Sequence, residues 1–134
     1  GTFETVSAES VVSYIHPGNR LATLVGFSGA MPEGAGRDVA MQAAAMAPVA
    51  LDESTIPQDL IEKELQIGKD LAIQEGKPAE MADKIAQGRL KKWFKEATLV
   101  NQAYIKDNKQ TVAEFINASA AGVKATAFSR AALD

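Results

Sequence analysis

Apolar residues recur with a helical period along two neighbouring stretches of the chain, within residues 55–97. At about 100° per residue, the apolar positions of each stretch gather on a broad face, and most charged positions lie opposite. Gly76-Lys77-Pro78 separates the stretches, since glycine readily ends a helix and proline suits the first turn of the next. The pattern therefore predicts two amphipathic helices that fold back on each other as a hairpin. Their apolar positions are Leu60, Ile61, Leu65, Ile67, Gly68, Leu71 and Ala72 in the first helix and Met81, Ala82, Ile85, Ala86, Gly88, Leu90, Trp93 and Ala97 in the second.

Single residues predict how this hairpin begins and how its helices pack. Thr55 is placed to cap the first helix, with Gln58 bonding back to it and Pro57 in the first turn. Gly68 and Gly88 lie on the apolar faces, where a missing side chain lets two backbones approach closely, although each glycine costs about 1 kcal/mol relative to alanine. The large side chains expected to be buried between the helices are Leu65, Leu71, Ile85 and Trp93.

The chain before the hairpin contains short runs of β-branched and aromatic residues, which are typical of strands. These runs occupy residues 2–8, 10–16 and 20–27, and the turn signal His16-Pro17-Gly18-Asn19 predicts that the last two form an antiparallel pair. Glycine-rich residues 28–36 predict a loop.

Alanine-rich residues 38–47 then predict a helix that ends at Pro48. Its small side chains indicate a helix pressed closely onto the sheet. These small residues are Ala40, Ala43, Ala44 and Ala47.

After the hairpin, residues 98–108 predict an irregular connection with one short extended piece. Thr111 and Glu114 match a capping box that opens a short helix, which Gly122 would end. Residues 123–133 alternate like a last strand, although Phe128 interrupts the alternation.

Strands first, helices in the middle and a strand last predict an α+β fold. We expect a two-layer domain in which helices cover a three-stranded antiparallel sheet, with the helical hairpin of residues 55–97 protruding from it. The length of 134 residues suits one domain with a sizeable core. The chain begins without a methionine, in strand-like sequence, so we expect it to be part of a longer protein.

Composition removes several classes of function. The formal net charge of -3 argues against direct binding to nucleic acid, which calls for a basic excess. No apolar run approaches the roughly 18 to 20 residues that span a bilayer, so no membrane contact is expected. The absence of cysteine excludes disulfides and cysteine metal sites and favours the cytosol. The basic run of residues 89–95 includes Trp93, but this residue lies on the apolar stripe, and the bases suit the negative end of the helix dipole.

His16 is the only histidine, so no catalytic constellation can be built around more than one candidate base. A turn residue that tolerates the geometry before Pro17 is the simpler interpretation of His16, and a catalytic or partner-contacting group is the alternative. The acidic residues at the start of the hairpin complement a helix dipole better than they suggest a metal site. The glycines of residues 26–36 are not followed by the Gly-Lys-Ser/Thr of a phosphate loop. We therefore expect no enzyme activity, no metal and no cofactor.

Several ordered motifs of the chain resemble bacterial elongation factor Ts. Ser13-Tyr14-Ile15-His16 followed by Asn19-Arg20-Leu21-Ala22-Thr23-Leu24-Val25 resembles the strand-turn-strand of that family. The family's central helix, helical hairpin and hairpin exit follow in the same order and at similar spacing, so the resemblance covers nearly the whole chain. The matching stretches are Asp38-Val39-Ala40-Met41-Gln42-Ala43-Ala44-Ala45, Val49-Ala50-Leu51, Ile61-Glu62-Lys63-Glu64, Gly76-Lys77-Pro78, Lys84-Ile85-Ala86-Gln87-Gly88-Arg89-Leu90-Lys91-Lys92-Trp93 and Gln110-Thr111-Val112-Ala113-Glu114-Phe115-Ile116.

The resemblance implies a guanine nucleotide exchange factor for elongation factor Tu, which promotes GDP release through protein contacts, not covalent chemistry. It also implies that residues 1–134 form a single domain of the type called the dimerisation domain. His16 occupies the family's Tyr-X-His position and is expected to contact the partner, together with Tyr14, Asn19 and Arg20. The resemblance is to the C-terminal part of the family's core together with the helical hairpin. The family's N-terminal helical module and its Thr-Asp-Phe-Val motif, which enters the partner's nucleotide domain, are not matched in this sequence, and Pro17-Gly18-Asn19 departs from the family's usual turn.

Two alternatives from other classes stay open at this point. A self-associating structural module, a homodimer with no exchange activity of its own, is favoured by the broad apolar faces of both hairpin helices. An enzyme that uses His16 is the more remote alternative. Titration with elongation factor Tu and GDP, beside sedimentation, distinguishes the three.

Overall fold

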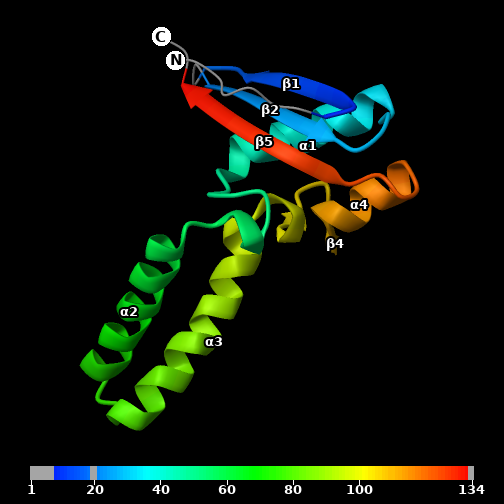
Figure 1. Cartoon of the computed structure of the whole chain (residues 1–134). Helices are drawn as coiled ribbons and strands as arrows, with labels where there is room; N and C mark the ends of the chain where they lie inside the picture. Colours follow the sequence, from blue (N-terminus) through cyan, green and yellow to red (C-terminus); the bar gives the residue numbers. More distant parts are fainter. Residues whose placement is uncertain (1–7, 19–20, 133–134) are drawn as a thin grey trace.

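The computed structural model of the chain describes residues 8–18 and 21–132 (Figure 1). A three-stranded antiparallel sheet lies against a layer of helices, and a long pair of helices points away from this body, which confirms the predicted α+β fold. The strand predicted at residues 2–8 lies outside the described residues, apart from Ala8. The elements are β1 (Ser10–His16), β2 (Leu21–Phe27), α1 (Glu33–Met46), η1 (Glu53–Thr55), α2 (Gln58–Gln74), α3 (Ala79–Ala97), η2 (Leu99–Asn101), β3 (Ala103–Tyr104), β4 (Asp107–Thr111), α4 (Val112–Ser119) and β5 (Ala125–Ala132).

The sheet has the strand order β1-β2-β5, so the nearly fully buried strand β2 is paired on both sides. Its pairing with β5 contains a bulge, where consecutive residues of β2 pair with Ala127 and Ala125 and leave Thr126 unpaired. The extra residue reverses the alternation of the strand, so both Ala125 and Phe128 pack against the core. The bulge explains why Phe128 interrupts the sequence pattern.

Helix α1 packs under the sheet through small side chains, as predicted. Ala40 and Ala43 are fully buried, and the Thr23 hydroxyl of β2 donates a 2.7 Å hydrogen bond to the Ala40 carbonyl. The prediction is wrong for Ala47, which is exposed because it follows the helix in a left-handed conformation with φ of 46°.

The start of α1 corrects the predicted loop, because the helix begins at Glu33 instead of Asp38. Gly36 belongs to its first turns and not to a loop. A Cβ atom at Gly36 would lie 2.8 Å from Cγ2 of Val12, so the missing side chain is what lets α1 approach β1. Gly36 therefore reflects close packing, whereas a Cβ atom at Gly34 would meet nothing within 4 Å.

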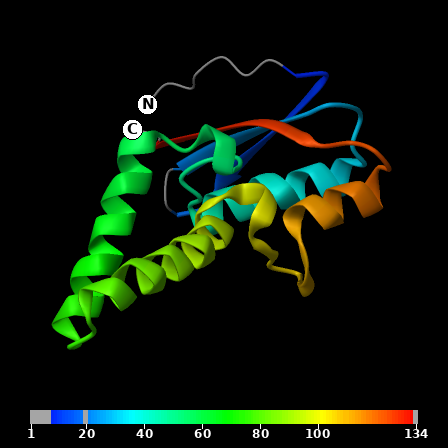
Figure 2. The same ribbon diagram turned by 60° about the horizontal axis from the view of Figure 1, so that its bottom comes forward.

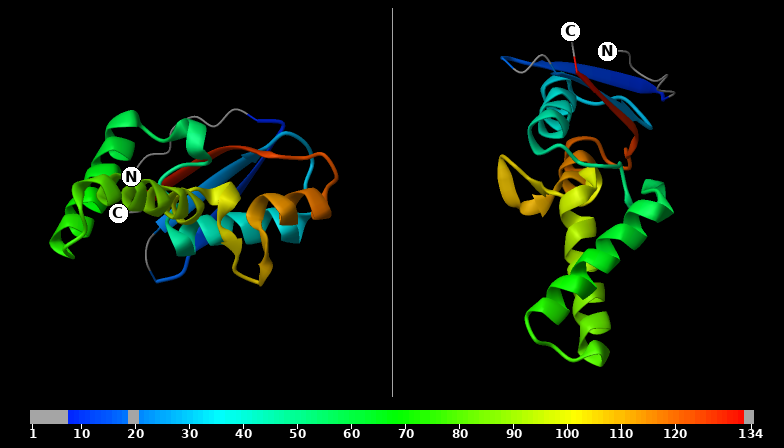
Figure 3. Two further views of the ribbon diagram at one scale, coloured as in Figure 1. Left: turned by 90° about the horizontal axis from the view of Figure 1, so that it is seen from below. Right: turned by 90° about the vertical axis from the view of Figure 1, so that its left-hand side faces the viewer.

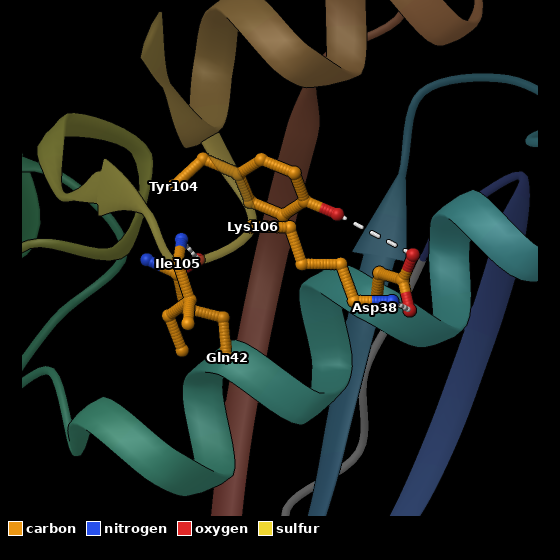
Figure 4. A network of polar contacts seen from close by, with 5 residues as sticks. All are labelled: Asp38, Gln42, Tyr104, Ile105 and Lys106. Carbon is orange, nitrogen blue, oxygen red and sulfur yellow. Dashed lines mark hydrogen bonds and ion pairs between the residues drawn. The ribbon is translucent and has the colours of Figure 1, made fainter. Parts of the chain in front are cut away.

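A polar network joins the small β3–β4 sheet to α1 (Figure 4). Buried Gln42 donates to a backbone carbonyl of β3 (2.9 Å) and accepts from the Ile105 N–H (3.0 Å). The Asp38 carboxylate accepts hydrogen bonds from Lys106 Nζ (2.9 Å) and the Tyr104 hydroxyl (3.3 Å). Burial, followed by the nearby Asp38 carboxylate, raises the pKa of Tyr104 to about 12. This network orders a segment that was predicted to be an irregular connection.

Two helix starts give opposite outcomes. Helix α4 has the predicted capping box, in which the Glu114 N–H donates to Thr111 Oγ1 (3.1 Å) and the Thr111 N–H to Glu114 Oε1 (3.0 Å). The predicted cap of α2 is wrong. The Thr55 hydroxyl instead donates to the Asp52 carbonyl (2.9 Å) within η1, and α2 begins after Pro57 without a side-chain cap.

The turn between α2 and α3 has the geometry predicted from Gly76, whose φ is 83°. The Gly76 N–H donates to the Ile73 carbonyl and the Lys77 N–H to the Ala72 carbonyl, each over 3.0 Å. These are the two bonds of a Schellman motif, which requires a left-handed residue at this position. Glycine is therefore needed to end α2 in this way.

Small residues, not large ones, form the contact between α2 and α3, which converge at the turn that joins them (Figures 2 and 3). A Cβ atom at Gly68 would lie 3.1 Å from Cα of Ala86, which confirms the close approach predicted at Gly68. The prediction for Gly88 is wrong, since this residue is exposed and a Cβ there would meet nothing within 4 Å. The buried residues of the contact are Gly68, Ala72, Ala82 and Ala86.

The predicted burial of large side chains between the helices is wrong for Leu71, which is 38% exposed. Leu65, Ile85 and Trp93 are only half-buried. The reason is geometric, because helices that approach through glycine and alanine leave larger side chains at the sides of the contact. We name the four side chains on one of these sides the hairpin flank: Ile67, Leu71, Met81 and Ile85.

The two ends of the hairpin meet at its base. The Val49 N–H donates to the Ala97 carbonyl (2.7 Å), and the Leu99 N–H donates to the Ala50 carbonyl (3.0 Å). Ala50 and Thr98 also form an isolated parallel bridge. The chain therefore leaves the domain and re-enters it at one place.

Candidate functional site

Tyr14 and His16 lie two residues apart on β1, so both side chains are on the sheet face that packs against α1. Their ring centres are 5.8 Å apart, and the ring planes are tilted by 53°. The Arg37 guanidinium of α1 lies 5.5 Å from the centre of the Tyr14 ring, within the range of a cation–π interaction. We name these three side chains the β1 cluster.

His16 is half-buried at the end of β1, where the chain turns toward β2. Its Nδ1 atom is enclosed and has no hydrogen-bond partner among the described residues. Pro17 and Gly18 are exposed, and a proline followed by a glycine with φ of 80° is the combination typical of a type II turn. The other two predicted contact residues, Asn19 and Arg20, lie outside the described residues.

β1 is an edge strand of the described sheet and has β2 as its only neighbour there. Such an edge presents backbone N–H and C=O groups that can pair with another chain. On the opposite face of β1 from the cluster, the Ile15 side chain is 66% exposed. A strand edge that has no partner among the described residues, an exposed isoleucine and the β1 cluster therefore lie together at the end of one strand.

Two of the four residues expected to contact a partner, Tyr14 and His16, belong to the β1 cluster. Tyr14 and His16 are brought together as their spacing requires. Arg37 was missed, because it lies in a stretch interpreted as the boundary between a loop and a helix, and no local pattern links it to Tyr14. The only sequence signal for the exposure of Ile15 is the alternation of the strand, which places its side chain on the opposite face from Tyr14 and His16.

Over the described part of the chain, no group of three or more histidine, aspartate or glutamate side chains is arranged to hold a metal ion. Within the same residues, no helix combines the length and the apolar character needed to cross a membrane. Two surfaces described above are candidates for contact with another molecule, the strand edge and the hairpin flank. They belong to an α+β fold from which the helices α2 and α3 project.

The family model described as "Elongation factor TS" matches residues 1–134. The chain therefore belongs to the elongation factor Ts family. Curated relatives carry the same name. The one from Christiangramia forsetii is 51% identical over 135 residues, and the alignment covers 99% of this chain and 49% of the relative. The relative from Amoebophilus asiaticus is 52% identical over 131 residues (96% and 47%), and the one from Porphyromonas gingivalis is 42% identical over 134 residues (100% and 49%). The chain spans about half the length of these relatives.

Proposed function

We propose that this chain is the part of a guanine nucleotide exchange factor that docks on elongation factor Tu through the β1 cluster and the adjoining turn. Its place of action would be the cytoplasm. The observation that carries the proposal is the position of His16, because a family match over the whole chain coincides with a half-buried histidine at an exposed strand end. The neighbouring Tyr14 and Arg37 fix the surface around it.

Docking alone does not amount to exchange. A factor accelerates GDP release only if it binds the nucleotide-distorted state of its partner more tightly than the GDP-bound state. A contact of equal strength in both states shifts nothing, however tight it is. The β1 cluster supplies a contact surface but no group that would enter a nucleotide site. We therefore propose that this chain alone binds elongation factor Tu weakly and does not appreciably accelerate the release of GDP from it.

The test is release of fluorescent GDP from elongation factor Tu with saturating chain, next to a direct binding titration. We expect this chain to bind measurably, the substitution His16→Ala to weaken the binding, and GDP release not to be accelerated. A longer family member that contains the Thr-Asp-Phe-Val motif should accelerate the release. Ser13→Ala, on the other face of β1, is the matched control. If the chain alone matched the longer protein, the exchange element would lie within residues 1–134.

Self-association through the hairpin is a second candidate, favoured by one specific observation. Exposed Gly88 lies beside the hairpin flank, where no contact within the described chain accounts for a glycine that costs about 1 kcal/mol in a helix. Leu71 and Met81 of the flank are 38% and 49% exposed. A second hairpin packed across this face would cover them and give Gly88 a close neighbour.

Sedimentation velocity tests this second candidate. Leu71→Asp should abolish a dimer, whereas Ile73→Asp should leave it intact, because Ile73 lies on the side of the hairpin marked by the Lys69–Asp83 ion pair (3.1 Å). Monomers at all concentrations of the unsubstituted chain would remove the candidate.

A further inference from the structure

A groove of about 470 Å³ lies where the base of the hairpin meets α1, the β3–β4 sheet and α4. Lys92 and Lys95 reach it from α3, and Lys109 reaches it from β4. Met46, which is 52% exposed, and exposed Ala103 add apolar surface. This basic groove is separate from the β1 cluster and shares no residue with it.

The convergence of three lysines is unexpected in a chain with a formal net charge of -3. The ion pairs found among the described residues involve Lys69 and Lys106, and neither uses a lysine of the groove. The helix dipole explains Lys95, which lies in the last turn of α3, but its influence does not extend to Lys92. Lys109 is on a strand, where no dipole of this kind acts.

Two glutamates also line the basic groove and limit what it can hold. Glu114 is engaged in the capping box of α4, where its Oε1 accepts the Thr111 N–H over 3.0 Å. Glu96 carries the second negative charge. A regular row of phosphates would meet these carboxylates at short range and a net negative protein at long range. A short segment that places its acids opposite the lysines, and uncharged side chains opposite Glu96 and Glu114, avoids the short-range repulsion.

We propose that the basic groove binds an acidic, amphipathic segment of a protein partner. Carboxylates of the segment would pair with Lys92, Lys95 and Lys109, and an apolar side chain would cover Met46. Complementary charge speeds association and fixes the register of such a contact, while the apolar contact adds affinity. The proposal stands independently of the docking assigned to the β1 cluster.

The probe is a twelve-residue synthetic peptide of aspartate, glutamate and leucine, titrated into the labelled chain and followed by NMR. We expect shifts concentrated on residues that line the groove, and no comparable binding by a peptide of asparagine, glutamine and leucine. Each of Lys92→Gln, Lys95→Gln and Lys109→Gln should weaken binding about two- to fivefold, the range for exposed charge pairs. Raising the salt concentration should weaken it further.

Lys91→Gln is the matched control, because it removes the same charge from the same helix one residue away from the groove. It should leave the peptide affinity unchanged, and all four variants should melt at the same temperature. Equal binding of the uncharged peptide, or shifts confined to the hairpin flank, would overturn the proposal. Tighter binding of a twelve-nucleotide oligothymidylate would also overturn it and assign the groove to nucleic acid.

Discussion

Gly68 and Gly88 occupy interior positions of neighbouring helices, yet the structure gives them different surroundings. Gly68 lies against the backbone of Ala86, whereas Gly88 faces open space. Both were predicted to permit a close approach, because sequence alone shows that a glycine is on an apolar face but not whether a second backbone passes there. The helix that passes Gly68 is set by the turn at Gly76, a feature of the whole hairpin.

Replacing each glycine with alanine tests this difference. Gly88→Ala should raise the free energy of unfolding by about 1 kcal/mol, because alanine favours the helix and meets no neighbour. Gly68→Ala gains the same helix propensity but forces a methyl group against Ala86, and we expect a net loss of about 1 to 3 kcal/mol. Urea unfolding of both variants gives the comparison. Equal effects would mean that α2 and α3 do not touch at Gly68.

The raised pKa of Tyr104 leads to a second prediction for a single residue, that the folded chain loses stability at high pH. Its pKa is about 12 in the folded chain and about 10.0 without the fold, so between these values the folded state retains a proton that the unfolded state has lost. The free energy of unfolding should therefore fall as pH rises from 10 to 12. Thermal unfolding of Tyr104→Phe, which cannot ionise there, should show a shallower fall over this range. An unchanged slope would contradict the proposed environment of the hydroxyl.

At the scale of elements, the sequence predicted those whose signal is local. The capping box of α4, the Gly76 turn and the strands on either side of Gly18 depend on residues close in sequence, and all are found. Elements fixed by distant contacts were missed. Helix α1 starts early because Gly36 meets Val12, and β3–β4 is ordered by Gln42. The two surfaces follow the same rule. Tyr14 and His16 are neighbours through the alternation of one strand, whereas Arg37 joins them, and the lysines of the basic groove meet, only in the fold.

The capping box of α4 offers a direct test at this scale. Thr111→Ala removes the oxygen that accepts the Glu114 N–H, and we expect the free energy of unfolding to fall by about 1 kcal/mol. Thr111→Ser retains that oxygen and should preserve most of the stability. Chemical unfolding monitored by circular dichroism would distinguish the two. A serine variant as unstable as the alanine variant would point to the lost methyl group instead of the cap.

At the scale of the whole molecule, stability is divided unequally between the body and the hairpin. The body contains the continuous core of β2, α1, η2 and α4, including the fully buried Phe27 and Leu99. The hairpin contact consists of small residues with half-buried or exposed large ones beside it. Its helices therefore depend more on their own propensity and on the contacts at the base than on a core.

Amide hydrogen exchange measures this division. We expect the slowest exchange in β2 and α1, and faster exchange in α2 and α3 toward the Gly76 turn, because local opening there exposes little apolar surface. The hairpin should open without the body unfolding. Uniform protection along the whole chain would show that the hairpin and the body unfold as one unit.

The backbone hydrogen bonds between residues 49–51 and 97–100 make the hairpin an insertion whose two ends are joined to each other at the body. A loop whose two stems are already fastened together can be lengthened, shortened or exchanged without moving the strands on either side, and the entropic cost of closing it rises only slowly with its length. A change of length in the arm should therefore leave the fold of the body unchanged. The same stems mark where a peptide linker could replace residues 53–96 and leave a compact, arm-free protein for separating the roles of the two parts.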